Sequence, residues 1–164
     1  MTAKEYNNCT RLWADDVMRF AVRLSTDRAD CEDAVQDAFA AMWKHRDKVS
    51  VDKGKSFLIS VAYRRLMSTF RRHKADERYI QTIRTSQQEP DTSFDIKEAI
   101  ERSLQALPET QRAIMQLRDV EGYSYREISE TLELSEEKVQ VYLFRARVAM
   151  RKQLITMGYD EYKQ

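Results

Sequence analysis

Apolar residues recur every three or four positions along most of the chain, which is the spacing of one face of an α-helix. The first helix is expected to end near the turn STDRAD, and its apolar stripe comprises Leu12, Trp13, Val17, Phe20, Ala21 and Leu24. A second helix is expected to begin there with Asp30 as its N-cap, and its stripe comprises Cys31, Ala34, Val35, Ala38, Phe39 and Met42. The segment HRDKVSVDKGKS then interrupts the pattern and is predicted to form a loop.

A third periodic segment, from about Ser56 to Lys74, has an apolar side and a basic side. The apolar side comprises Ile59, Ala62, Tyr63, Leu66 and Phe70, and the opposite side comprises Arg64, Arg65, Ser68, Arg71 and Arg72. A solvated basic face is the ordinary interpretation of such a pattern. The density of arginine, with no acidic residue between Arg64 and Lys74, instead favours contact with nucleic acid.

The stretch ADERYIQTIRTSQQEPDTSFDI has no sustained periodicity and is predicted to be a flexible linker. We therefore predict an all-α fold of two small helical domains, with a linker between them and a short tail after the second. The predicted boundaries are residues 1–75, 76–95, 96–158 and 159–164.

The second domain is predicted to contain four helices, the last two forming a helix-turn-helix. Its first two helices are marked by the apolar residues Ile96, Ile100, Leu104, Leu107, Ile114, Leu117 and Val120. Gly122 suits a left-handed helix end, and Ser124 with Glu127 matches a capping box. After a break at 133–135, which Leu134 is expected to plug, Ser135 caps a helix with the buried stripe Val139, Leu143, Ala146 and Met150.

The outer side of this last helix is polar and basic, and it carries Lys138, Gln140, Val141, Tyr142, Arg145 and Arg147. A helix held in this way enters the DNA major groove, where side chains near its N-terminus meet base edges and basic groups meet phosphates. Gln140 and Tyr142 are the predicted base readers. A helical hairpin built only for packing is the alternative.

Composition narrows the possibilities further. The chain has 164 residues, 34% of them charged, with only 3 Gly and 2 Pro, which favours helices. No apolar run approaches the roughly 18 residues of a membrane span and MTAKEYNNCT has no signal core, so we expect a cytoplasmic protein without membrane insertion. Cys9 and Cys31 are expected to be reduced, and His45 and His73 form no cluster with zinc-ligand spacing.

No Gly-rich phosphate loop and no Ser/His/Asp constellation is present, so neither an enzyme nor a cofactor or metal is expected. The formal net charge of +1 is uninformative by itself, because the placement of the charges decides which partners they attract.

LPETQRAIMQLRDVEGYSYREISETLELSEEKVQVYLFRARVAMRKQL resembles the C-terminal promoter-binding domain of bacterial RNA polymerase sigma factors. DCEDAVQDAFAAMW is similar to the family's polymerase-docking helix, and SFLISVAYRRLMSTFRRHK to its helix for the minus-ten promoter element. Two domains and a linker are the plan of the extracytoplasmic-function (ECF) subfamily. The resemblance implies a non-catalytic initiation factor that is a monomer when free.

The resemblance also implies residue roles. By this resemblance, Asp33, Gln36 and Asp37 would lie on the surface that docks onto the clamp helices of the polymerase's largest subunit. A loop over 46–55 would hold a base flipped from the minus-ten element, whose contacts would be Lys53, Lys55, Arg64, Arg65, Ser68, Arg71 and Arg72. Contacts with the minus-thirty-five element would be Ser124, Lys138, Gln140, Val141, Tyr142, Phe144, Arg145 and Arg147. The implied partners are core RNA polymerase, including the flap of its second-largest subunit, promoter DNA and an anti-sigma factor.

Several positions depart from the family's usual residues. Arg64 stands where Asn is common, Arg65 where an apolar residue is usual and Ser68 where Asp is common. Val141 replaces Ser or Lys, and Tyr142 replaces Arg. The sequence therefore does not predict the minus-ten specificity, and an unusual minus-thirty-five preference is expected. A stand-alone helix-turn-helix regulator, whose first domain serves dimerisation or sensing, is the alternative to a sigma factor.

Overall fold

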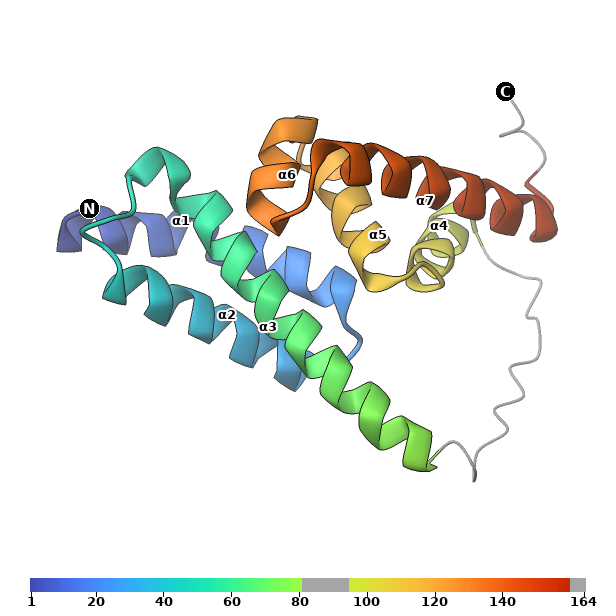
Figure 1. The fold of residues 1–164 in the computed structure, drawn as a ribbon, viewed down its shortest axis with the longest axis horizontal. Coiled ribbons are helices and arrows are strands. Elements are labelled where there is room, and N and C mark those ends of the chain that lie inside the picture. The colour runs from blue at the N-terminus through green and yellow to red at the C-terminus, as the bar shows by residue number, and fades with distance from the viewer. Residues whose placement is uncertain (81–94, 160–164) are drawn as a thin grey trace.

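The structure, a computed structural model, describes residues 1–80 and 95–159, and the regular elements in those ranges are helices (Figure 1). The first three are α1 (Ala3–Leu24), α2 (Arg28–Lys44) and α3 (Val51–Ile80). The others are α4 (Ile96–Gln105), α5 (Glu109–Met115), the π-helical segment η1 (Gln116–Val120), α6 (Tyr125–Leu132) and α7 (Glu136–Thr156). The predicted all-α fold is confirmed.

The N-terminal domain is a bundle of α1, α2 and α3, whose apolar stripes meet in one core. Phe20, Leu24, Met42, Leu58 and Leu66 are among its fully buried side chains. The predicted N-cap of α2 was wrong. Asp27 caps the helix, because its carboxylate accepts the backbone N–H of Asp30 at 3.1 Å. Asp30 therefore lies in the first turn of α2 rather than before it.

The predicted loop HRDKVSVDKGKS is also shorter than expected, because α3 begins at Val51 and contains Gly54. A Cβ atom on Gly54 would lie only 2.6 Å from Cζ3 of Trp13 in α1. Gly54 therefore permits a close approach of two helices, whereas the sequence pattern predicted that it lies in a loop. At its other end α3 continues to Ile80, beyond the predicted end at Lys74. The predicted linker 76–95 thus starts inside a helix, and its residues 81–94 lie outside the described residues.

The C-terminal domain packs α4, α5 and α6 against the long helix α7. Gly122 takes the predicted left-handed conformation, with φ +72°. Ser124 and Glu127 form the predicted capping box, and Ser135 caps α7 by accepting the N–H of Lys138. The four predicted stripe residues of α7 are buried, and Leu134 packs partly buried against the core. The helix-turn-helix is therefore formed as predicted.

Three residues assigned to apolar stripes are exposed. Leu12 is 68% exposed, because α1 turns its neighbour Trp13 towards α3 instead. Val120 is 55% exposed, and it ends the π-helical segment η1, whose wider turn breaks the register of the α5 stripe. Ile96 is 37% exposed in the first turn of α4, where Ala99 and Ser103 supply the buried positions.

The two domains are in contact. Helix α6 lies against the first half of α3, and α5 lies against α1 (Figure 1). Buried residues of both domains belong to one continuous hydrophobic cluster. Within the described part of the chain, no helix is long and apolar enough to cross a membrane.

Candidate polymerase and promoter interfaces

The face of α7 that lies opposite its buried stripe is open for most of its length. Gln140, Val141 and Arg145 are exposed there, and Phe144 is 70% exposed. Two residues predicted to contact the minus-thirty-five element, one as a base reader and one at a phosphate, have other contacts. Tyr142 is half-buried against the hydrophobic cluster, and Arg147 donates from Nη2 to Oδ1 of Asp119 at 2.9 Å.

The start of the helix-turn-helix is held by local hydrogen bonds. The Ser124 hydroxyl accepts the N–H of Glu127 at 3.1 Å, and the Glu127 carboxylate accepts the N–H of Ser124 at 3.2 Å. Lys138 is exposed in the first turn of α7. The structure therefore gives Ser124 a capping role beside its predicted DNA contact.

On α3 the predicted basic side is exposed, and it divides into two groups. Arg65, Ser68 and Arg72 face α2 across a polar cavity of about 330 Å³ whose α2 wall includes Asp33, Gln36 and Asp37. Arg65 Nε lies 3.4 Å from Oδ2 of Asp37. The predicted polymerase-docking residues and part of the predicted minus-ten surface thus line the same cavity.

The second group turns towards the C-terminal domain. Arg64 Nη1 lies 3.4 Å from Oε1 of Glu133 in the turn of the helix-turn-helix. Lys55, predicted to contact DNA, is instead enclosed, with its Nζ 3.1 Å from both Asp16 Oδ2 and Glu121 Oε2. Partial burial lowers the pKa of Lys55, but the hydrogen bonds that its ammonium donates to these two carboxylates, together with their negative charge, outweigh that effect and raise the pKa above its ordinary value.

Tyr63 was predicted to lie in the core, and it is 7% exposed. Its hydroxyl lies 3.1 Å from Oγ1 of Thr110 in α5. Burial raises the pKa of Tyr63, and the Thr110 hydrogen bond partly offsets that effect. Tyr123 behaves similarly, because burial raises its pKa while a hydrogen bond with Ser56 lowers it. Neither phenol is placed to stack on a base in this arrangement.

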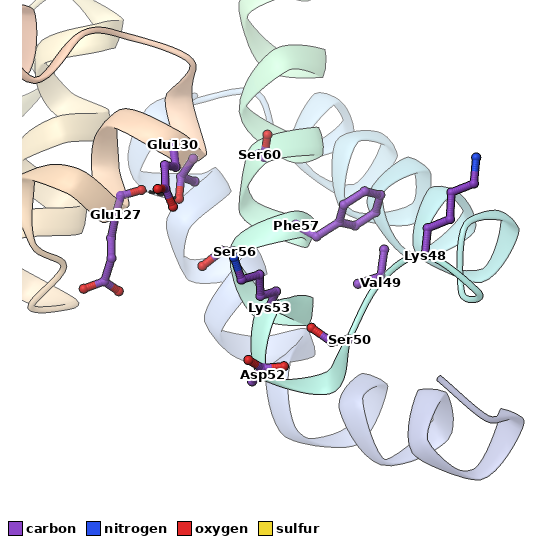
Figure 2. A pocket seen from close by; sticks show the side chains of 11 residues that line it. Lys48, Val49, Ser50, Asp52, Lys53, Ser56, Phe57, Ser60, Glu127 and Glu130 are labelled. Atoms are coloured by element: carbon purple, nitrogen blue, oxygen red, sulfur yellow. Dashed lines mark hydrogen bonds between the residues drawn. The ribbon is translucent and has the colours of Figure 1, made fainter.

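A cavity of about 480 Å³ lies where the first turns of α3 face α6 (Figure 2). Phe57 and Val49 line it together with Lys53 and several serines from the start of α3. Glu127, Glu130 and Thr131 of α6 form the opposite wall. The cavity overlaps the segment 46–55 that was expected to hold a flipped base, although the second half of that segment, from Val51, is helical rather than a loop.

Sequence reasoning missed the acidic residues of the C-terminal domain that pair with predicted promoter contacts, namely Asp119, Glu121 and Glu133. All three lie in η1 or in turns rather than on a periodic helix face. The sequence signal for them is weak, because they are simply acidic residues near the turn before α6 and in the turn between α6 and α7. Within residues 1–80 and 95–159, no group of His, Cys, Asp and Glu has the arrangement of a metal site.

Comparisons with known proteins identify the class of protein. Residues 10–75 match the model of sigma-70 region 2, and residues 97–150 match the model of sigma-70 region 4. The first match lies within the span of α1–α3, and the second lies within the span of α4–α7. The chain is thus built from two domains of the sigma-70 type, which belong to non-catalytic subunits of RNA polymerase.

Individual relatives narrow the class to a subfamily of sigma factors. It is 26% identical over 156 residues to the ECF RNA polymerase sigma factor SigM of Bacillus subtilis, covering 92% of this chain and 95% of SigM. It is 26% identical over 147 residues to SigL of Mycobacterium tuberculosis, covering 85% and 83%. The chain belongs to the ECF RNA polymerase sigma factors, and it acts in promoter recognition and transcription initiation through regions 2 and 4.

A solved structure shares this fold. The sigma factor RpoE from Bartonella quintana, crystallised with the anti-sigma factor NepR, superposes with a TM-score of 0.74 at 20% identity. The match covers 93% of this chain and 98% of RpoE.

Proposed function

We propose that this chain binds core RNA polymerase and divides promoter recognition between its two domains. The supporting observation is that one domain carries an acidic surface and a basic surface side by side, while the other presents the open face of a helix-turn-helix. Acidic residues suit a protein partner and arginines suit phosphates. A stand-alone DNA-binding regulator has no need for the first of these surfaces.

Polymerase docking is assigned to the exposed side of α2. Asp33 lies one helical turn before Gln36 and Asp37, and all three are exposed. We assign them to the clamp helices of the largest subunit, and we assign the C-terminal domain to the flap of the second-largest subunit. Polymerase binding would have to break the ion pair between Arg65 and Asp37. This costs little, because both side chains are about half exposed to solvent.

Minus-ten recognition is assigned to α3. Arg71 and Arg72 are exposed and form no ion pair within residues 1–80 and 95–159, so their guanidinium groups are available to contact the phosphates of a DNA strand. Lys53, Lys55, Arg64, Arg65 and Ser68 complete the proposed surface. The cavity beside Phe57 would receive a flipped base, whose unstacking costs a few kcal/mol that hydrogen bonds and stacking offset.

Minus-thirty-five recognition is assigned to α7 in the major groove. Gln140 presents an amide suited to adenine, and Val141 and Phe144 present apolar surface suited to a thymine methyl group. Arg145 and Arg147 are assigned to phosphates, with Ser124, Lys138 and Tyr142 at the edges of the contact. Most of these side chains are exposed, as a groove-binding face requires.

We further propose that the protein works in the cytoplasm with RNA polymerase, is a monomer when free, and is held inactive by an anti-sigma protein. The match to an RpoE that was crystallised with its anti-sigma factor supports the last point. No cofactor or metal is assigned.

The test is transcription by sigma-free core polymerase mixed with the purified protein and a promoter library. Specific start sites that share two upstream elements are expected. A lack of stimulation, together with tight binding of the protein alone to a palindromic site, would favour the stand-alone regulator.

A further inference from the structure

The row of residues that lies opposite the buried stripe of α7 begins with a carboxylate. The members of this outward row recur at intervals of four, three and four residues, which places them on one face of the helix. They are Glu137, Val141, Phe144 and Val148, and all four are exposed. Glu137 lies near the N-terminus of the helix, the end that a helix-turn-helix presents to base edges.

The carboxylate of Glu137 has no partner in the part of the chain that the structure describes. It accepts no hydrogen bond there and forms no ion pair. Two neighbouring glutamates of the helix-turn-helix differ in this respect, because Glu130 pairs with Arg126 and Glu133 pairs with Arg64. Glu137 is therefore free to accept hydrogen bonds from another molecule.

A negative charge at the centre of a DNA-binding face is unfavourable unless it makes a specific contact, because DNA phosphates repel it. Glu137 does lie in the first turn of α7, where the helix dipole favours an anion. Glu136 lies in the same turn and receives the same stabilisation. It is rotated about 100° from Glu137 around the helix, towards the buried stripe. The helix dipole therefore does not explain a second carboxylate in the outward row.

Base edges in the major groove offer a carboxylate two kinds of donor, which are the N4 amine of cytosine and the N6 amine of adenine. Guanine presents only the acceptors N7 and O6, and thymine presents the acceptor O4 and a methyl group. Adenine carries the N7 acceptor beside its amine, so the second oxygen of a carboxylate would face a lone pair. Cytosine has a C–H group beside its amine, and it is therefore the base that suits Glu137 best.

The spacing of the outward row indicates where this cytosine lies. Val141 follows Glu137 by four residues, which corresponds to about 6 Å along the helix. Successive base pairs are about 3.4 Å apart along the duplex. The two side chains therefore reach base pairs that are no more than about two steps apart. Because Val141 offers apolar surface to a thymine methyl group, cytosine and thymine are expected close together in the element.

We propose that Glu137 is a base-reading residue of α7 and selects cytosine in the minus-thirty-five element by accepting a hydrogen bond from its N4 amine. This inference rests on the proposed function for the placement of α7 in the major groove. It adds an acceptor to a face whose other central members, Val141 and Phe144, are apolar. Specificity for a C·G pair then comes from a carboxylate rather than from an arginine that contacts guanine.

The first experiment uses the reconstituted holoenzyme to select promoters from a library in which the upstream element is randomised. The wild-type protein should enrich cytosine at one position of that element. Glu137→Ala should abolish the enrichment at that position and retain it at the others. Glu136→Ala is the matched control, because it removes the same charge from the same helical turn and should retain the cytosine. Equal enrichment of cytosine by the wild type and by Glu137→Ala would overturn the proposal.

The second experiment measures upstream occupancy by nuclease footprinting on two promoters, the selected one and a copy in which the C·G pair is replaced by T·A. The affinity of the wild-type holoenzyme should fall by about fivefold or more on the altered promoter, as expected for the loss of one good base contact. Glu137→Ala should bind both promoters equally. Glu137→Gln should favour A·T at that position, because an amide pairs with N6 and N7 of adenine. Undiminished discrimination by both variants would contradict base reading by Glu137.

The outcomes separate this inference from the proposed function. Specific start sites whose upstream preference does not respond to substitution of Glu137 would refute the inference and retain the sigma function. The absence of specific start sites with the wild type and with every variant would refute the proposed function, and the inference would fall with it.

Discussion

The two domains reach similar helical folds by different means. The region 2 domain consists of three long helices that are held together by buried apolar side chains, and Phe20, Leu58 and Leu66 are fully buried there. The region 4 domain has several short segments whose directions depend on polar caps at Ser124 and Ser135 and on the left-handed residues Gly122 and Glu133 in the turns before and after α6. Apolar volume stabilises the first, whereas local hydrogen bonds orient the second.

The largest effect is expected from emptying the core of the region 2 domain. Phe20→Ala should lower the free energy of unfolding by about 3–5 kcal/mol, because a fully buried aromatic ring leaves a cavity. Urea denaturation followed by circular dichroism measures this loss. Leu12→Ala on the exposed side of the same helix is the control, and a loss of similar size there would contradict the core described here.

A smaller effect is expected where α1 and α3 approach most closely. Gly54→Ala should destabilise the region 2 domain by about 1–3 kcal/mol, because the new methyl group would overlap the ring of Trp13. Trp13→Leu should relieve part of that loss when the two substitutions are combined. If Gly54→Ala is neutral or stabilising, the close contact is absent and Gly54 costs the helix stability for no packing reason.

In the region 4 domain the expected effect is smaller again and comes from a cap. Ser124→Ala should cost about 1 kcal/mol, because the first turn of α6 loses the acceptor for the N–H of Glu127. Ser68→Ala, at an exposed position inside α3, should change stability little. Hydrogen exchange that becomes faster in α6 but not in α1 would locate the effect. Uniformly faster exchange would contradict domain-specific capping.

The contact between the two domains should make the stability of the protein depend on pH in the alkaline range. The pKa values of Lys55, Tyr63 and Tyr123 are all raised in the folded protein. Each of these groups therefore contributes fully to the stability of the folded protein at pH values below its ordinary pKa, which is about 10 to 10.4. That contribution is lost as the pH rises through the raised pKa of the folded protein.

Absorbance at 295 nm should show late-titrating tyrosines, and Tyr63→Phe should remove one of them. The radius of gyration should increase over the same alkaline range. A chain that opens near pH 7 instead would rule out Lys55 as the titrating contact.

Periodicity predicted the parts of the fold that depend on local patterns. The stripes of α2 and α7, the capping box at Ser124 and the left-handed Gly122 all followed from residue type and spacing. Gly54 was misread because its role depends on Trp13, which is 41 positions away in the sequence and contributes no local signal. The exposure of Val120 depends on a π-helical turn, which has no reliable sequence signature.

In the candidate surfaces, too, features that depend on local pattern were predicted, whereas contacts that depend on tertiary packing were not. Residue type and resemblance indicated the basic side of α3 and the outer side of α7, and their exposure is confirmed for Arg71, Arg72 and Arg145. The partners of Lys55 and Arg64 could not be predicted, since Glu121 and Glu133 meet them only after the two domains pack together. Long-range pairing of charges depends on tertiary structure, which a pattern along the chain does not contain.

The division of labour between the domains is tested most directly by comparing Arg71→Ala and Arg145→Ala in the reconstituted holoenzyme on one promoter. Permanganate reactivity of unpaired thymines measures melting, and a nuclease footprint over the upstream element measures duplex binding. Arg71→Ala should reduce melting and leave the upstream footprint, whereas Arg145→Ala should weaken the upstream footprint first. Equal losses of both signals in both variants would contradict the assignment of melting to α3 and of upstream recognition to α7.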